Sequence, residues 1–124
     1  MQSFYQETFR MQAVEEAARY CVLESDVLTL SLILIPEHIA TGIVLTDPPT
    51  RRESVPVKLT FPVDNIDDLR PVVTWLGGVV DPPEDRWEFR GQVRCDGVDP
   101  EGNIIQFLQP IPQITSPPDH EKVV

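Results

Sequence analysis

The chain of 124 residues has the length of one domain, and 41% of its residues are hydrophobic, so a single buried core is sufficient. Its formal net charge of −10 argues against a nucleic-acid partner, because phosphate binding requires a clustered excess of Lys and Arg. No apolar run approaches the about 20 residues that span a bilayer, and residues 1–10 lack a leader pattern, so we expect a cytoplasmic protein without membrane contact.

The first half predicts a short helix followed by strands. Residues 3–9 carry apolar side chains at helical spacing. Residues 19–23 and 28–35 are rich in strand formers and are separated by a turn at 24–26, so two paired strands are expected, with 11–16 a weaker third. Residues 36–56 contain prolines and polar residues and predict a connection, with a short extended stretch at 43–45.

The second half opens with a strand at 57–63, whose alternation places Leu59 and Phe61 on the core face and Lys58 on the other. Asn65 can then cap a helix that runs to about residue 76, where two glycines end it. Proline removes a backbone N–H, so Pro71 is expected near the first helical turn.

Further strands are predicted at 79–80, 92–98 and 104–108. In 92–98, Cys95 lies on the side opposite Arg94 and Asp96. The sequence at 99–103 is a strong turn signal, and the tail from 110 is expected to be loosely ordered.

The two halves repeat one pattern at a spacing of about 55 residues. The second half is a strand, a helix and three strands, and the first half is the same series without its opening strand. We therefore expect one domain over 1–124, with a first module at about 1–46, a second at about 55–109 and a tail at 110–124.

The cysteines and histidines predict no metal or redox motif. Cys21 and Cys95 are far apart and lie in apolar segments, which indicates buried reduced thiols. His38 lies beside a proline beyond the first-half strands, and His120 lies in the tail, so both are expected at the surface.

Four segments together resemble the vicinal-oxygen-chelate superfamily, which includes glyoxalase I, bleomycin-resistance proteins and extradiol dioxygenases. They are Phe4-Tyr5-Gln6-Glu7-Thr8-Phe9, Phe61-Pro62-Val63-Asp64-Asn65-Ile66, Leu76-Gly77-Gly78 and Asp99-Pro100-Glu101-Gly102-Asn103-Ile104-Ile105-Gln106-Phe107. The resemblance implies an α+β fold in which two βαβββ modules form a curved mixed sheet around a concave cavity. Catalytic members of the superfamily hold a divalent metal on that concave face.

The positions that the resemblance assigns to metal ligands hold other chemistry in this chain. The first ligand would come from the opening strand, which has no counterpart, and the others fall on Ser31, Lys58 and Gln106. A protonated Lys adds positive charge where a cation should sit. We therefore expect no metal and no cofactor, and the residues do not favour an enzyme.

The same three residues form a candidate ligand site. Ser31, Lys58 and Gln106 are polar residues on otherwise apolar strands, so they either line one concavity or face solvent on an open sheet. Within a cavity, Lys58 could pair with an anionic group, whereas the net charge favours a cationic ligand, and the sequence leaves both open. Arg94 and Trp87 join the candidate site, Trp87 either stacking on a ligand or packing at the sheet rim.

The leading hypothesis is a metal-free small-molecule binding protein similar to the bleomycin-resistance branch. One alternative is a metal-dependent lyase or dioxygenase-like enzyme with unusual or partner-supplied ligands, and another is a structural homodimerising module. A homodimer is expected because the absent opening strand leaves a neighbouring strand edge unpaired, which a second chain or residues 111–114 could cover.

Overall fold

The computed structural model describes residues 1–112. The elements are, in chain order, α1 (Gln2–Phe9), β1 (Gln12–Glu16), β2 (Tyr20–Glu24), β3 (Thr29–Ile33), α2 (Glu37–Ala40), β4 (Leu59–Pro62), α3 (Ile66–Trp75), β5 (Val79–Val80), the 3-10 helix η1 (Pro83–Asp85), β6 (Trp87–Phe89), β7 (Gln92–Val98) and β8 (Ile104–Pro110). Within this part of the chain, every helix is too short or too polar to cross a membrane.

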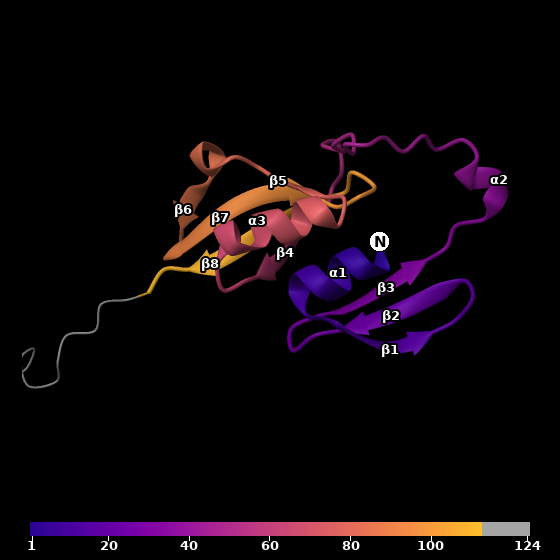
Figure 1. Ribbon diagram of the computed structural model, residues 1–124, viewed down its shortest axis with the longest axis horizontal. Helices are drawn as coiled ribbons and strands as arrows, with labels where there is room; N and C mark the ends of the chain where they lie inside the picture. The colour runs from indigo at the N-terminus through magenta and orange to yellow at the C-terminus, as the bar shows by residue number, and fades with distance from the viewer. Residues whose placement is uncertain (113–124) are drawn as a thin grey trace, which may run out of the picture.

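The strands form two sheets. The first sheet is antiparallel, in the order β1-β2-β3, and the second has the order β4-β8-β7-β5, with β6 paired to β7. Strand β4 runs parallel to β8, whereas β7 and β8 are antiparallel. Figure 1 shows α1 and α3 lying side by side, with α3 across the second sheet. The predicted α+β class and the repeat of helix and strands are confirmed.

Helix α3 follows the predicted start and end. The side chain of Asn65 accepts a hydrogen bond from the backbone N–H of Asp68, and Gly77 adopts a positive φ of 92° just after the helix. Pro71 lies deeper in the helix than a position near the first turn, because it is the sixth of the ten helical residues. Its side chain is exposed, so the proline lies on the solvent side of α3 and not on its buried side.

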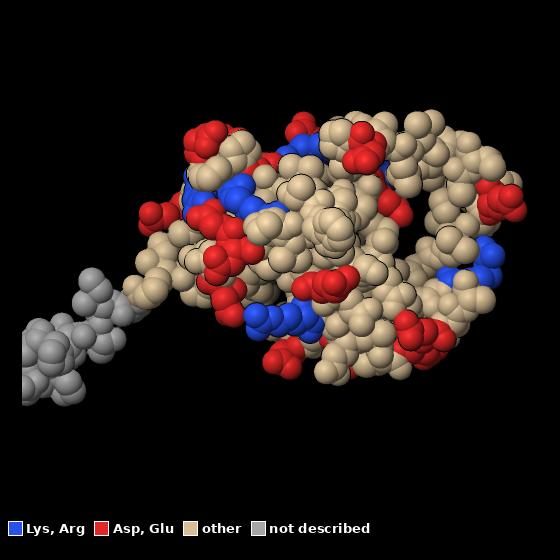
Figure 2. Space-filling model, viewed as in Figure 1, with Lys and Arg blue, Asp and Glu red and all other residues tan. Residues whose placement is uncertain are grey.

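Residues 34–58 form a long connection between the two sheets. The extended stretch expected at 43–45 is absent there, and the segment contains helix α2 instead. Several of its apolar side chains are exposed, including Ile39, Val44 and Val57. In Figure 2 this connection arches away from the body and leaves an opening between them, so few neighbours are available to bury its side chains. We call residues 34–58 the arch.

The segment before β7 also differs from expectation. Residues 81–89 contain η1 and the strand β6, which pairs with β7 through Trp87–Arg94, Glu88–Val93 and Phe89–Gln92. The sequence indicated only a loop followed by an aromatic residue. The pairing places Trp87 and Phe89 beside Arg94 on one side of the second sheet.

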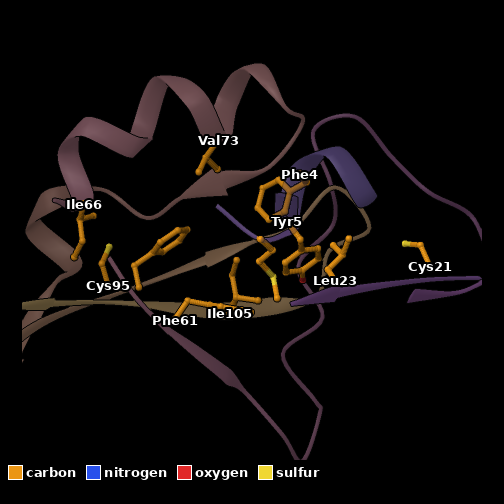
Figure 3. Packing of buried hydrophobic residues seen from close by; sticks show 11 residues of the cluster. Phe4, Tyr5, Cys21, Leu23, Phe61, Ile66, Val73, Cys95 and Ile105 are labelled. Carbon is orange, nitrogen blue, oxygen red and sulfur yellow. The ribbon is translucent and has the colours of Figure 1, made fainter. Parts of the chain in front are cut away.

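One hydrophobic core joins both sheets. Figure 3 shows residues of α1 and β2 packed together with residues of β4, α3, β7 and β8. Phe9 of α1 stacks on Phe61 of β4 with ring centroids 4.0 Å apart, and its ring also contacts Phe107 of β8. Helix α1 therefore connects the first sheet to the second through aromatic contacts.

A buried hydrogen bond fixes the same helix to the turn before β8. The hydroxyl of Tyr5 donates to Oδ2 of Asp99 over 2.6 Å, and Asp99 is fully buried. Asp99 also accepts from the backbone N–H groups of Glu101 and Asn103 and from the amide of Asn103. The predicted turn at 99–103 is thus closed around a carboxylate that α1 helps to satisfy.

The thiol predictions are confirmed, because Cys21 and Cys95 are both free and buried. Burial raises the pKa of the Cys95 thiol, which keeps it protonated and unreactive. His38 lies exposed on α2, and His120 lies outside the described residues.

Candidate ligand-binding face

The second sheet has a polar face opposite its core face. Along β8, Ile105 and Phe107 point into the core, so Gln106 between them points to the other side. The same alternation places Arg94 and Asp96 of β7 on that side, because Cys95 is in the core. We call the surface formed by Lys58, Trp87, Phe89, Arg94, Asp96 and Gln106 the polar face.

Lys58 is neutralised on this face. Its Nζ lies 2.8 Å from Oδ2 of Asp96, whose side chain is only 14% exposed. The other oxygen of Asp96 accepts from Nε2 of Gln106 over 3.2 Å. Two of the predicted site residues, Lys58 and Gln106, are therefore brought together by a carboxylate, and the charge of Lys58 is offset within the protein.

Arg51 reaches the same region from the arch. The chain there is tied to the turn before β8, because Arg52 pairs with Asn103 and its N–H donates to Gly102. The guanidinium of Arg51 then makes a two-bond contact with Asp81 at 2.6 and 3.0 Å and lies 3.8 Å from Asp96. The hydrogen bonds to Asp81 raise the pKa of Arg51 above its ordinary value, so this cation is also paired.

Arg94 differs from the other two cations. Its guanidinium donates to Oε1 of Gln106 over 2.7 Å and to Oε1 of Gln92 over 2.8 Å, and both acceptors are neutral. It lies over the ring of Phe89, with 5.2 Å to the centroid, and Trp87 is its register partner on β6. Within residues 1–112, its Nε is buried without a hydrogen-bond partner and no carboxylate pairs with it. Arg94 thus retains an uncompensated positive charge over the ring of Phe89, on a strand position opposite Trp87.

Ser31 does not join this arrangement. It lies on β3 of the first sheet, where its register partner is Val22. It lines a separate cavity of about 460 Å³, together with residues such as Tyr20, Ile33 and Leu34. None of Lys58, Trp87, Arg94 and Gln106 lines that cavity, so the structure brings together four of the five candidate residues and leaves Ser31 apart.

Comparison with solved structures shows many chains of similar shape. A glyoxalase/bleomycin resistance protein/dioxygenase family enzyme from Burkholderia phytofirmans superposes with a TM-score of 0.63 at 20% identity, over 88% of this chain and 87% of that one. The fosfomycin resistance protein FosX from Listeria monocytogenes, solved with Mn(II) and sulfate, gives 0.61 at 12% identity, over 88% and 78%. A glyoxalase-related enzyme from Fulvimarina pelagi gives 0.55 at 20% identity, over 86% and 75%.

This chain has the glyoxalase/bleomycin-resistance fold. The fold that the resemblance to the vicinal-oxygen-chelate superfamily implied is thereby confirmed. No protein-family model and no curated protein matches the sequence. Identities of 12–20% show the fold alone, so the chemistry of this chain depends on its own side chains.

A divalent metal, which the resemblance implies for catalytic members of the superfamily, does not fit the residues found here. The positions that the resemblance assigns to ligands carry an ammonium, a hydroxyl and an amide, at Lys58, Ser31 and Gln106, and Ser31 lies on the other sheet. Asp96, the nearby carboxylate, is already paired with Lys58. Within residues 1–112, no three His, Cys, Asp or Glu side chains are grouped as a metal site would require.

Sequence reasoning missed Arg51, Asp81 and Phe89. Alternation along β7 did place Asp96 beside Arg94, so its role could have been found from the pattern alone. The contribution of Arg51 depends on the contact between the arch and the turn at 99–103, for which the sequence offers no local signal.

Proposed function

We propose that this chain is a small-molecule binding protein that holds its ligand on the polar face without a metal ion. The residues that would contact the ligand are Arg94, Trp87 and Phe89. Gln106 would hold the guanidinium of Arg94 in place, and Lys58 would hold Asp96 beside Gln106. The glyoxalase-type fold is compatible with this proposal, because one fold can carry sites for unrelated functions. The free buried thiols Cys21 and Cys95 support a reducing compartment such as the cytoplasm.

The observation that carries the proposal is the unpaired charge of Arg94. Lys58 and Arg51 are matched by Asp96 and Asp81, whereas Arg94 has only neutral acceptors. A partly buried guanidinium without a counter-charge is costly, and a carboxylate from a ligand would remove that cost. We therefore infer an anionic group on the ligand, attached to a flat apolar body that can lie against Trp87 and Phe89.

The net charge of the chain and the local charge of Arg94 have opposite effects on an anionic ligand. The net charge of −10 repels anions in general. At contact distance, however, the local Arg94 charge outweighs more distant carboxylates, because those are screened over about 10 Å at moderate ionic strength. Binding of an anion should accordingly strengthen when salt is raised to a level that screens the acidic surface but not the buried contact.

Calorimetric titration with 2-naphthoate tests the proposal, with 2-naphthylmethylammonium as the probe of opposite charge. We expect the carboxylate to bind and Arg94→Gln to weaken it at least 10-fold, which corresponds to about 1.4 kcal/mol. Arg19→Gln, which removes the same charge from an exposed position, should leave binding within about twofold. Preference for the ammonium probe, or equal loss in both variants, would refute the proposed site.

A separate titration tests the proposal that the ligand is bound without a metal ion. Titration of the protein with Zn²⁺, Ni²⁺, Mn²⁺ and Fe²⁺ should show no stoichiometric binding in the micromolar range. Stoichiometric binding that is lost in Gln106→Leu would favour a metal-dependent enzyme instead.

A further inference from the structure

Arg94 stands at a boundary between charged and apolar side chains on the polar face. Residues that oppose each other in strand register lie on the same face of a sheet, so the register of β6, β7, β8 and β4 defines three rows across this face. The rows, taken from Asp96 back along β7, are Asp96 with Gln106 and Thr60, then Trp87 with Arg94, Leu108 and Pro62, and last Phe89 with Gln92 and Pro110. The row on one side of Arg94 carries the carboxylate that pairs with Lys58, and the row on the other side carries apolar side chains around Gln92.

Leu108 and Pro110 of β8 form an apolar surface next to Arg94. Gln109 of the same strand points to the helix side, because its Oε1 accepts a hydrogen bond from the backbone N–H of Ile66 in α3. Leu108 and Pro110, on either side of it, therefore point to the polar face. Leu108 is half-buried but does not belong to the hydrophobic core, and Pro110 is exposed. We call these two residues the apolar strip. An apolar strip beside an uncompensated cation suits an anion that carries an apolar body.

The groups around the guanidinium decide from which side an anion reaches it. On the charged side, the amide nitrogen of Gln106 already donates to Asp96. On the β6 side, the ring of Phe89 lies against the guanidinium, with 5.2 Å from its centroid to Cζ of Arg94. Oε1 of Gln92 accepts from Arg94 over 2.8 Å, so the amide nitrogen of Gln92 remains as a donor. An anion that accepts from both Arg94 and Gln92 therefore lies above β7 with the apolar strip beside it.

We propose that the apolar strip determines which ligands this site accepts, and that it selects aromatic carboxylates whose rings extend along β7 away from Arg94. The inference rests on the proposed function and names the class of ligand for it. Arg94 and Gln92 would hold the carboxylate. One face of the aromatic body would lie against Trp87, and the other face would lie against Leu108.

The spacing of the strands sets the shape of that body. Strands β6 and β8 each lie about 4.8 Å from β7, so Trp87 and Leu108 stand on lines about 10 Å apart and leave room for the thickness of one aromatic ring. Along β7, the rows of Arg94 and Gln92 are separated by about 7 Å, which corresponds to two fused rings. A body that extends beside its carboxylate, and not away from it, would lose contact with the apolar strip.

Two isomers with equal charge and nearly equal apolar area test the proposed shape. In 2-naphthoate the second ring continues away from the carboxylate, whereas in 1-naphthoate it lies beside the carboxylate. Calorimetric titration of the full chain is expected to show about 5-fold tighter binding of 2-naphthoate, because only its second ring reaches along the apolar strip to Pro110. Tighter binding of 1-naphthoate, or equal binding of the two isomers, would overturn the inference.

Leu108→Ala tests the part that the apolar strip takes in this preference. We expect the preference for 2-naphthoate to fall to about twofold or less, because removal of the side chain opens space beside the carboxylate for the second ring of 1-naphthoate. Both isomers are measured on one preparation, so a partly unfolded variant changes the binding stoichiometry but not the ratio of the two constants.

Ile104→Ala is the matched control for Leu108→Ala. Ile104 is also half-buried, outside the core and on the same face of β8, but it lies beyond Gln106 on the charged side. The variant should keep the preference for 2-naphthoate within about twofold of the native chain. Loss of the preference in both variants, or in neither, would refute the role of the apolar strip.

The inference and the proposed function can fail separately. Arg94→Gln should weaken both isomers by about 10-fold or more, because both need the guanidinium. If it does so while the native chain binds the two isomers equally, the proposed function stands and the apolar strip has no part in selection. If neither isomer binds to the native chain, the proposed function and this inference are both wrong.

Discussion

At the residue scale, the fold depends on a buried carboxylate that is not part of the polar face. Asp99 is fully buried and accepts hydrogen bonds from Tyr5, Glu101 and Asn103. A buried charge is tolerated only when its acceptors are satisfied. The turn at 99–103 supplies most of the donors locally, and Tyr5 adds one from a helix at the other end of the chain.

We expect Tyr5→Phe to destabilise the protein by about 1.5–3 kcal/mol, because it leaves a buried carboxylate oxygen with fewer donors. Urea unfolding followed by circular dichroism measures the change. Tyr20→Phe, which removes an exposed hydroxyl that donates to Glu15, is the control and should change stability by less than about 0.5 kcal/mol. Equal effects would contradict the assigned role of Tyr5.

The hydrogen-bonded pair of Tyr5 and Asp99 predicts that the protein loses stability at alkaline pH. Burial, together with the neighbouring Asp99, raises the pKa of Tyr5 above the ordinary value of 10.0. The folded state therefore retains a proton that the unfolded chain releases, and the stabilisation is complete below pH 10 and declines as pH rises above it. Unfolding free energy measured from about pH 9 to about pH 11.5 should fall more steeply in the native chain than in Tyr5→Phe.

Individual site residues could be predicted from the sequence where the alternation of a strand shows which face of the sheet they lie on. A polar residue between two core residues, such as Gln106 between Ile105 and Phe107, can be assigned to the opposite face from the sequence. The pairing of Lys58 with Asp96 could not be assigned in this way. It depends on the strand order β4-β8-β7, which brings side chains from β4 and β7 to either side of β8.

At the element scale, the long alternating strands and the capped helix α3 were predicted well, and the short elements were not. Strands β7 and β8 carry seven residues each and α3 carries ten, so their periodicity is visible. Helix α2 and strand β6 have four and three residues, which is too few for a period to be recognised. Tertiary contacts fix such elements. The division into modules at about 46 and 55 stays a prediction.

The position of Pro71 predicts that its replacement stabilises α3. It occupies the interior of α3, where proline costs a backbone hydrogen bond to the residue four positions earlier. We expect Pro71→Ala to stabilise the protein by up to about 3 kcal/mol, measured by thermal and urea unfolding. Pro83→Ala is the control, since Pro83 begins η1, where proline is well tolerated. A destabilised Pro71→Ala protein would mean that the ring has a packing role that its exposure does not reveal.

At the scale of the whole molecule, α1 unites two sheets that share no strand pairing. Its side chains, together with Leu23 of β2, pack against Phe61 and Phe107 of the second sheet. The shared core predicts one cooperative unfolding transition and not two. No pattern in the sequence indicated this arrangement, because periodicity shows which residues are buried but not which element buries them.

Truncation of the stacked ring tests the connection. We expect Phe9→Ala to destabilise the chain by about 3 kcal/mol and to separate the hydrogen exchange of Leu23 from that of Phe107. In the native chain both amides should exchange through the same global opening. Val44→Ala, on the exposed arch, should change neither quantity. Independent exchange of the two amides already in the native chain would contradict the shared core.

The arch has a practical consequence. It connects two bodies of structure that already adhere through Tyr5, Phe9 and Asp99, and its residues 34–48 are exposed and open to proteases (Figure 2). A single cut there should yield two fragments that stay associated, and the separately expressed pieces should reassemble when mixed. The polypeptide is thus a natural candidate for a split reporter, with the break placed near Val44.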